Sequence, residues 1–154
     1  MKESAGILPF KSDAAGLRVL LAHPGGPFWA SRDLGAWTII KGEIADGETP
    51  EKAACREFHE ETGWPLFACL VPLGTIRQTA GKTVHCFAAD AWFDPSSLRS
   101  NEFVLEWPPQ SGRTASFPEV DRAEWFEIDR AGSKILQAQR PFLQRLRSLL
   151  TSTT

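Results

Sequence analysis

The chain of 154 residues is 42% hydrophobic and 23% charged, which is typical of one globular domain and excludes an intrinsically disordered segment. Its net charge of −2 excludes the overall basic field that would recruit nucleic acid or an anionic membrane surface. No apolar run approaches the roughly 20 residues that span a bilayer, and the N-terminus lacks the apolar segment of a secretory signal. We therefore expect a single cytoplasmic domain over residues 1–154 with no membrane partner.

The first 40 residues predict three strands. Short apolar runs at residues 5–11 and 17–23 flank a turn-forming sequence, Ser-Asp-Ala-Ala-Gly, so we expect two consecutive strands there. A loop rich in Gly and Pro follows at residues 24–29. The β-forming sequence Ala-Trp-Thr-Ile-Ile at residues 36–40 then predicts the third strand.

The clearest helix follows this third strand. Thr49 is a suitable N-cap, and Pro50 suits the first helical position because the N–H that proline lacks has no partner there in any helix. We expect the helix to end at about Thr62, since Gly63 favours the left-handed conformation that terminates helices and Pro65 cannot continue one.

The second half of the chain alternates extended segments with turns. Residues 69–78 and 83–93 predict a hairpin around Thr-Ala-Gly-Lys, and shorter strands are expected at residues 103–107 and 123–128. An amphipathic helix is expected at residues 141–150. Interleaved strands and helices without a repeat or linker predict an α/β or α+β class.

The three cysteines match no disulfide framework or CxxC-type metal motif. Cys55, Cys69 and Cys86 are odd in number and widely spaced. We expect them to be buried, reduced thiols, because free cysteine is among the most often buried residue types.

Three glutamates share one face of the predicted helix. An α-helix turns ~100° per residue, so with Glu57 at zero, Glu60 falls at about −60° and Glu61 at about +40°. Cys55 and Phe58 lie on a different arc, which can pack on a sheet. Clustered carboxylates supply the hard oxygen ligands that Mg²⁺ or Mn²⁺ prefers, although most acidic helix faces are simply solvated.

The residues around this acidic face follow a regular spacing: Gly42, five residues, Glu48, seven residues, Arg56-Glu57, Phe58, any residue, Glu60-Glu61, any residue, Gly63 and Trp64. This segment resembles the signature of the Nudix hydrolase family at every fixed position. Two positions that the family normally fills with aliphatic residues carry Phe58 and Trp64, which are also apolar but larger.

The resemblance implies an α/β/α sandwich with a mixed, partly antiparallel sheet, in which the signature forms a loop–helix–loop. It implies that Glu57, Glu60 and Glu61 are catalytic and bind a divalent metal, usually Mg²⁺, with Mn²⁺ as the alternative. It also implies that Arg56 pairs with Glu48 to hold the loop against the helix.

The resemblance extends to the backbone of the signature. Gly42 would allow the backbone to approach the site, and the carbonyl of Lys41 would be a further metal ligand. Gly63 would end the helix. A late acidic residue often completes sites of this family, and Glu119 is the candidate, as metal ligand and catalytic carboxylate. It lies five residues before Glu124-Trp125, which resembles the Glu-Trp that opens the family's late strand; Glu124 itself and an ordinary loop carboxylate are the alternatives.

The reaction that the resemblance implies is hydrolysis of a nucleoside diphosphate linked to another group. Metal ions neutralise and orient the phosphates and lower the pKa of a bound water, and a carboxylate takes the proton as the water attacks phosphorus. Glu60, Glu61 and Glu119 are the alternatives for this base. No Ser/His/Asp or Cys/His arrangement in the sequence indicates a covalent intermediate.

Basic and aromatic side chains are candidates for substrate contacts: Lys41, Arg32, Arg77, Lys82 and Trp29. Lys41 is the best of them, because residues 37–42 (Trp-Thr-Ile-Ile-Lys-Gly) resemble the Trp-x-x-Pro-Lys-Gly approach of Nudix enzymes that cleave dinucleoside polyphosphates, with Ile40 in place of the proline. Trp29, together with Phe28, either stacks on a base or covers the core.

Three functions compete at this point. A metal-dependent pyrophosphohydrolase for nucleoside triphosphates or dinucleoside polyphosphates is favoured because the signature is intact. A Nudix-fold module that binds a nucleotide without turnover is the first alternative. RNA 5′-end processing is the second; the lack of an extended basic stripe argues against it, although Arg140, Arg145 and Arg147 are basic. A homodimer is compatible with the resemblance, since many relatives dimerise.

Overall fold

The computed structural model describes residues 2–151. Its strands are β1 (Glu3–Asp13), β2 (Gly16–Pro24), β3 (Ile40–Glu43), β4 (Leu70–Gln78), β5 (Lys82–Asp90), β6 (Glu102–Glu106), β7 (Thr114–Pro118) and β8 (Val120–Glu127). Its helices are α1 (Pro50–Thr62), α2 (Ile128–Lys134) and α3 (Arg140–Thr151), with short 3₁₀ turns at Thr79–Gly81, Pro95–Ser97 and Gln137–Gln139. None of the helices in this part of the chain is long and apolar enough to cross a membrane.

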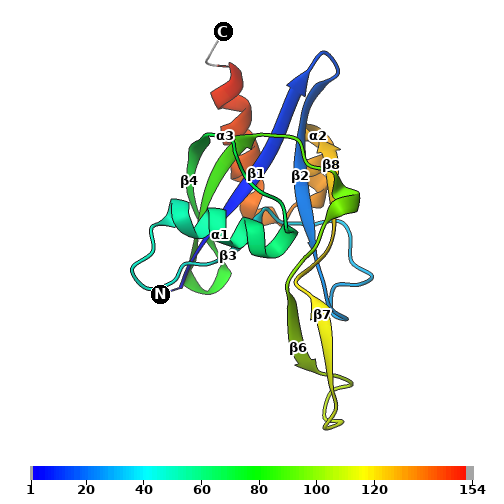
Figure 1. Cartoon of the computed structure of the whole chain (residues 1–154). Helices are drawn as coiled ribbons and strands as arrows, with labels where there is room; N and C mark the ends of the chain where they lie inside the picture. The colour runs from blue at the N-terminus through cyan, green and yellow to red at the C-terminus, as the bar shows by residue number, and fades with distance from the viewer. Residues whose placement is uncertain (1, 152–154) are drawn as a thin grey trace.

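A mixed sheet forms the centre of the molecule (Figure 1). Its strands are ordered β4-β5-β1-β2-β8, and β3 pairs with β1 outside this path. β1 and β5 run parallel, whereas the other pairs in this sheet are antiparallel. β1 is therefore the central strand, with β5 along one edge and both β2 and β3 along the other.

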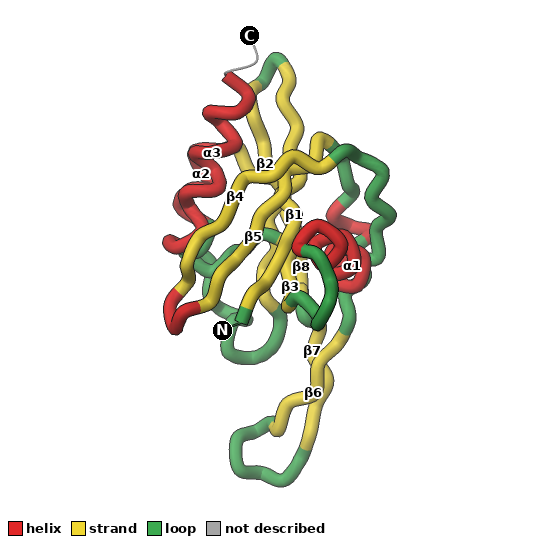
Figure 2. Tube along the Cα trace, turned by 90° about the vertical axis from the view of Figure 1, so that its left-hand side faces the viewer, coloured by secondary structure: helices red, strands yellow, loops and turns green. Residues whose placement is uncertain are grey.

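Helices cover both faces of this sheet, with α1 on one side and α2 and α3 on the other (Figure 2). Alternate residues of a strand point to opposite faces, so consecutive residues of β1 enter different cores. Ile7 packs in the cluster that includes Phe58 of α1, and Leu8 packs in the cluster that includes Phe142 of α3. Burial on both faces explains why this strand is continuously apolar rather than alternating. The α/β/α layers and the mixed sheet confirm the predicted fold.

Helix α1 has the ends that the sequence predicts. The Thr49 side chain accepts a hydrogen bond from the N–H of Lys52 at 3.2 Å, and Pro50 occupies the first turn. Gly63 terminates the helix in the left-handed region with φ 75°. Local capping chemistry is therefore sufficient to place this helix.

The third strand begins later than predicted. In the segment at residues 36–39, only Trp37 and Thr38 form isolated bridges, to Ile135 and Ala22 respectively. The regular strand β3 starts at Ile40 and pairs with β1. The reason is that the chain changes its pairing partner here, from Ala22 and Ile135 to β1. Pairing with such distant residues leaves no local sequence signal.

Two short elements were not expected from the sequence. Helix α2 contains Gly132 and Ser133, which disfavour a helix, and its burial against the sheet compensates for them. Strand β7 contains only five residues and ends at Pro118. Both elements are short enough for tertiary contacts to outweigh local preference.

The expectation of three buried cysteines is wrong for two of them. Cys86 is buried, but Cys55 and Cys69 are exposed. The buried residues of α1 are Ala53, Ala54, Phe58, Glu61 and Thr62. The buried side of this helix thus includes Glu61, and Cys55 lies on the exposed side.

Strands β6 and β7 form a separate hairpin, here called the arm (residues 102–118), which projects from the body of the molecule (Figures 1 and 2). Phe103 faces Phe117 across the two strands. Directly after β6, the Trp107 ring packs edge-on against the Phe28 ring, with the two ring centroids 5.5 Å apart. The arm therefore contacts the loop that follows β2.

Candidate active site

Strand β3 approaches α1 so closely that a side chain at position 42 would meet the Glu57 carboxylate. A Cβ atom added to Gly42 would lie 2.0 Å from Oε2 of Glu57. Because glycine lacks this atom, the Glu57 carboxylate can pack directly on the β3 backbone. The close backbone approach expected at Gly42 thus has a steric basis.

The acidic face of α1 is only partly solvated, because Glu61 is buried whereas the Glu60 side chain is 39% exposed. Glu61 is 9% exposed, and within residues 2–151 its carboxylate has no hydrogen-bond partner. Burial raises the pKa of Glu61 to about 8, and the negative charges of Glu119, Glu57 and Glu60 add to this effect. A carboxylate in these surroundings is stabilised by a proton or by a nearby cation.

Arg56 joins the signature loop to the helix. Its Nε and Nη2 donate to the two carboxylate oxygens of Glu48 at 2.8 and 2.9 Å, so the expected Arg56–Glu48 pair is present and bidentate. This pairing lowers the pKa of Glu48 to about 2, with a further contribution from the N–H of Ala45. The remaining Nη1 contacts Glu57 at 2.7 Å and Glu60 at 3.2 Å.

The fold brings Glu119 to the same acidic face from a distant part of the chain. Burial is the main cause of the raised pKa of both Glu57 and Glu61, and the charge of Glu119 adds to both shifts. Glu119 follows β7 directly, at the base of the arm. The alternative, Glu124, lies exposed on β8 opposite Leu21. The structure therefore groups Glu119, not Glu124, with the glutamates of α1.

Backbone contacts at the base of the arm were not foreseen from the sequence. The N–H of Glu119 donates to the carbonyl of Asn101 at 2.7 Å, and the N–H of Asn101 donates to the carbonyl of Glu60 at 3.0 Å. On its other side, the carbonyl of Glu119 accepts from the N–H of Gly25 at 3.0 Å. These partners are far apart in sequence, so no local pattern could have found them.

The donor set of this site fits a hard divalent cation such as Mg²⁺, because burial and the neighbouring carboxylates raise the pKa of Glu57 and Glu61, and within the described residues the buried Glu61 carboxylate has no hydrogen bond. In the observed rotamers, however, no three Asp, Glu, His or Cys side chains within residues 2–151 lie close enough together to hold one ion. Glu57 and Glu60 are both turned toward Arg56. Ligation by these two residues therefore requires their side chains to rotate away from the arginine.

Among the predicted substrate contacts, Lys41 lies beside the acidic face, and Lys82 is close enough for its charge to act on Lys41. Lys41 occupies β3 opposite Gly6. Burial lowers the pKa of the Lys41 ammonium, the charge of Lys82 lowers it further, and the neighbouring carboxylates act in the opposite direction. Arg77 is exposed on β4, opposite Thr83, and no ion pair within the described residues engages its guanidinium.

The other two predicted contacts belong to the loop after β2. The Arg32 guanidinium lies 5.6 Å from the centroid of the Trp29 ring. No hydrogen bond or ion pair in the described part of the chain joins either side chain to the acidic face. Beneath this loop, the buried His23 ring contacts the carbonyl of Arg32 at 2.6 Å and Asp121 at 2.8 Å. The fold thus holds the Trp29 and Arg32 side chains together in this loop.

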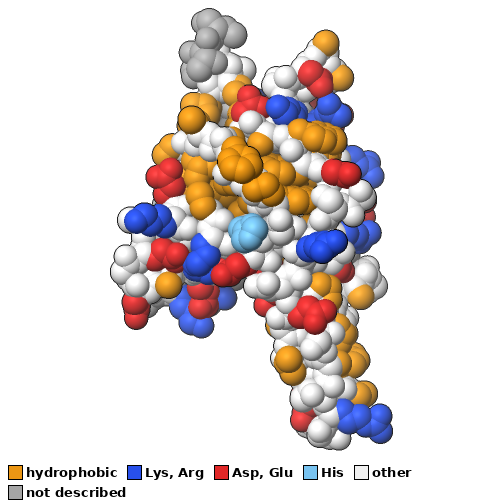
Figure 3. Space-filling view, in the orientation of Figure 1, with side chains coloured by type: hydrophobic (Ala, Val, Ile, Leu, Met, Phe, Trp, Pro, Cys, Tyr) orange, Lys and Arg blue, Asp and Glu red, His pale blue; other side chains and the backbone are white. Residues whose placement is uncertain are grey.

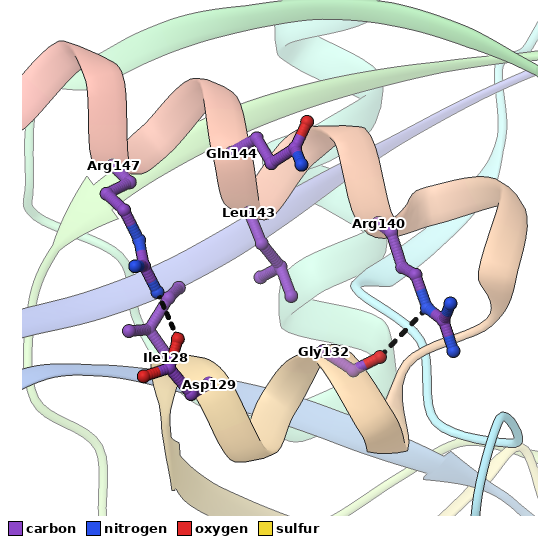
Figure 4. Close-up of a pocket in the computed structure, with 7 residues that line it drawn as sticks. All are labelled: Ile128, Asp129, Gly132, Arg140, Leu143, Gln144 and Arg147. Carbon is purple, nitrogen blue, oxygen red and sulfur yellow. Dashed lines mark hydrogen bonds and ion pairs between the residues drawn. The ribbon is translucent and has the colours of Figure 1, made fainter.

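A pocket of about 350 Å³ is lined by residues of α2 and α3, which Figure 4 draws as sticks. These two helices lie across the sheet from α1 (Figure 2). Arg140 and Arg147 line the pocket, and they donate to the carbonyl of Gly132 at 2.9 Å and to Asp129 at 2.6 Å. Because this pocket lies on the opposite face of the sheet from the glutamates, it is separate from the candidate active site.

Comparison with known proteins gives the family. The NUDIX domain matches residues 2–146 of the chain. An RNA pyrophosphohydrolase from Brucella anthropi is 32% identical over 144 residues, which cover 77% of this chain and 76% of the relative. Other curated relatives are matched over a smaller share of their length. The chain covers 24% of an octanoyltransferase from Myxococcus xanthus, to which it is 31% identical over 97 residues, or 63% of this chain. It covers 33% and 30% of two further relatives.

Solved structures share the fold over nearly the whole chain. An Ap4A hydrolase from C. elegans superposes with a TM-score of 0.67 at 20% identity, covering 99% of both chains. The NUDIX domain of NrtR from Shewanella oneidensis, solved with ADP ribose, superposes with a TM-score of 0.65 at 17% identity, covering 96% of this chain and 87% of that one. The domain match over almost the full length, on a fold shared with these structures, shows that this chain belongs to the Nudix family.

Proposed function

We propose that the chain is a divalent-metal-dependent pyrophosphohydrolase that cleaves a nucleoside diphosphate linked to another group. The observation that carries the proposal is the buried Glu61 carboxylate, which has no hydrogen-bond partner among residues 2–151 and is grouped with Glu57, Glu60 and Glu119. Buried anions of one sign are stable together only when a proton or cation compensates them. Mg²⁺ suits such oxygen donors, with Mn²⁺ as the alternative.

The side chains of the site would share the work of hydrolysis. Glu57, Glu60, Glu61 and Glu119, with the Lys41 carbonyl, would hold the metal. When bound, it would neutralise the phosphates and lower the pKa of water. The Lys41 and Lys82 ammonium groups would contact phosphate oxygens. A carboxylate of Glu60, Glu61 or Glu119 would take a proton from water as the water oxygen bonds to phosphorus and the P–O bond to the leaving phosphate breaks.

Arg56 and Glu48 have a supporting role in this scheme. Their bidentate pair fixes the signature loop against α1 without contacting the phosphates. Arg56 also neutralises part of the charge of Glu57 and Glu60. It therefore holds the Glu57 and Glu60 carboxylates close to the site, and they would have to rotate away from Arg56 to bind a metal.

Nucleoside triphosphates and dinucleoside polyphosphates are the substrate classes that we propose to test first. The purified chain would be incubated with each substrate and Mg²⁺, and both products would be identified so that the cleaved anhydride bond is located. We expect turnover that a chelator abolishes and that Glu60→Gln lowers at least 100-fold, in line with removal of a metal ligand.

Glu124→Gln is the matched control, because Glu124 is an exposed glutamate outside the acidic face. It should retain wild-type activity. A folded Glu60→Gln variant with full activity would refute the proposal. Tight binding of a nucleotide without products, in the presence of Mg²⁺ or Mn²⁺, would instead support a module that binds nucleotides without turnover.

RNA 5′ ends are the second candidate substrate, because the Brucella anthropi relative is named an RNA pyrophosphohydrolase. The surface offers limited support: acidic and basic side chains are interspersed on the face that carries α1 (Figure 3). On α3, Arg145 donates to the carbonyls of Leu73 and Thr75 and is therefore already engaged. Hydrolysis of 5′-triphosphorylated RNA in preference to free nucleotides, with steeply salt-dependent binding, would favour this substrate.

A further inference from the structure

We infer that Ser100 is a positioning residue that holds Glu119 in the acidic face. The inference rests on the proposed function, in which Glu119 is a metal ligand. It concerns a side chain outside the Nudix signature, in the segment that leads into the arm.

The Ser100 hydroxyl bridges the two strands at the base of the arm. Its Oγ accepts a hydrogen bond from the N–H of Val120 at 2.9 Å and donates one to the carbonyl of Asn101 at 2.8 Å. The same carbonyl accepts from the N–H of Glu119 at 2.7 Å. The N–H groups of Glu119 and of the residue after it are therefore both fixed by the Ser100–Asn101 segment.

That segment is itself bonded to the helix that carries the other glutamates. The N–H of Asn101 donates to the carbonyl of Glu60 at 3.0 Å, and the N–H of Arg99 donates to the carbonyl of Thr62 at 2.8 Å. These carbonyls belong to the last turn of α1, where they lack partners within the helix. Hydrogen bonds therefore connect the Glu60 carbonyl to the Glu119 N–H through Asn101. The Ser100 hydroxyl adds a bond from the same segment to the N–H of Val120.

Gly25 confines Glu119 from the other side. Its N–H donates to the Glu119 carbonyl at 3.0 Å, and a Cβ added to Gly25 would lie 1.9 Å from the carbonyl oxygen of Pro118. The Pro118–Glu119 backbone is thus held between the Gly25 loop and the Ser100–Asn101 segment. The Glu119 side chain extends from this backbone toward carboxylates that repel it, so its position depends on these bonds.

The serine hydroxyl is the part of this arrangement that a substitution can remove. Alanine at position 100 would leave the N–H of Val120, a residue 8% exposed, without its partner, whereas threonine keeps a hydroxyl on the same carbon. Loss of the bond frees the backbone beside Glu119. The arm beyond the base can keep its own strand pairing, because that pairing does not involve Ser100.

The test compares Ser100→Ala, Ser100→Thr and a control, Ser116→Ala, which removes an exposed hydroxyl from β7. Mn²⁺ affinity, measured by electron paramagnetic resonance without substrate, should weaken about 10- to 100-fold in Ser100→Ala, as for other residues that orient metal ligands. Ser100→Thr should restore it, and Ser116→Ala should leave it unchanged. Hydrogen exchange of the Val120 amide should accelerate only in Ser100→Ala.

A double-mutant cycle with Glu119→Gln identifies the path of the effect. If Ser100 acts through Glu119, Ser100→Ala should cost little further affinity once Glu119 is replaced. An undiminished effect in the Glu119→Gln background, or unchanged Mn²⁺ affinity despite fast Val120 exchange, would overturn the inference. Gly25→Ala displaces the same backbone from the opposite side and provides a second variant if Ser100→Ala does not fold; it should show the same dependence on Glu119.

If the proposed function is wrong, the same experiments should give a different result. In that case the wild-type chain would bind no Mn²⁺, and Glu60→Gln would change nothing. The Val120 exchange rate and the mobility of the Glu119 backbone, followed by NMR, would still support or refute the positioning by Ser100.

Discussion

Glu61 shows how the surroundings of a single residue prepare it for a cation. It lies on the inward side of α1, among other carboxylates, with no hydrogen bond to its oxygens within residues 2–151. Its pKa rises from the usual value of 4.5 to about 8, chiefly because of burial. Near neutral pH, ionisation of Glu61 therefore opposes folding unless a cation is bound.

Replacement of Glu61 by Gln should make stability less dependent on pH. Since the pKa is raised on folding, Glu61 stabilises the fold fully below pH 4.5, and this contribution is lost as the pH rises through about 8. In chelator, the wild-type melting temperature should fall by several degrees between pH 5 and pH 9, and that of Glu61→Gln should fall less. Mg²⁺ at pH 9 should raise the melting temperature of the wild type only. Equal pH profiles by circular dichroism would contradict this account.

The Glu48–Arg56 pair predicts the opposite pH dependence. The pKa of Glu48 is lowered to about 2, so its stabilising contribution is present above pH 4.5 and is lost as the pH falls through 2. Glu48→Gln should melt at a lower temperature than the wild type at pH 7, and the difference should shrink toward pH 2. Glu43→Gln is the control, because its side chain is 70% exposed and forms an ion pair with Lys2 at 3.6 Å rather than with Arg56. A constant difference at all pH values would argue against the ion pair as the cause.

Two elements, β3 and α1, meet so closely at Gly42 that a side chain there would displace the Glu57 carboxylate. The Gly42 backbone and the Glu57 carboxylate would overlap with any Cβ placed between them. The strand and helix that contact here are adjacent in sequence, joined by the loop that Arg56 and Glu48 brace. This supersecondary unit therefore carries three of the four glutamates.

Gly42→Ala tests this contact. The added methyl group should displace the Glu57 carboxylate and lower kcat/KM about 100-fold, since misplacement of a catalytic group by about 1 Å has effects of that size. Gly132→Ala is the matched control, because a Cβ there meets nothing within 4 Å and alanine favours the helix α2. It should keep full activity. Retention of activity by Gly42→Ala in a steady-state assay would show that the contact is dispensable.

At the scale of the whole molecule, the described residues form two apolar cores, one on each face of the sheet, and only one of them supports the site. Phe58 is fully buried in the core under α1, where its ring lies 5.0 Å from that of Phe93. Phe142 is fully buried in the core under α3. The helix that carries Phe58 also carries the glutamates, whereas α3 lies across the sheet from them (Figure 2).

Replacement of Phe58 and of Phe142 by alanine should distinguish the loss of folding stability from the loss of Mn²⁺ affinity. Phe58→Ala and Phe142→Ala should each lower the free energy of unfolding by about 3–5 kcal/mol, as expected for a large buried side chain. At a temperature where both variants remain folded, only Phe58→Ala should weaken Mn²⁺ binding, because α1 shifts into the cavity left by the ring. Denaturant unfolding and Mn²⁺ titration measure the two effects. Equal loss of Mn²⁺ affinity in both variants would show that general destabilisation is the cause.

Much of the site follows from local sequence. The caps at Thr49 and Gly63 determine the ends of α1, and helical geometry alone places Glu57, Glu60 and Glu61 together. The partner of Arg56 is eight residues away, close enough for the signature spacing to specify it. These features depend on contacts between near neighbours, which a sequence pattern encodes directly.

Other features required the assembled tertiary structure. The burial of Glu61, the approach of Glu119 and the hydroxyl bridge of Ser100 all arise where β3, the base of the arm and the Gly25 loop meet α1. The late start of β3 and the short helix α2 have the same origin, since their partners are distant in the chain. The sequence by itself determined the acidic helix, its braced loop and the family's chemistry, because these depend on local spacing. Only the tertiary structure decided how far each carboxylate is removed from water and which hydrogen bonds position Glu119, because desolvation and long-range hydrogen bonds exist only once the chain is packed.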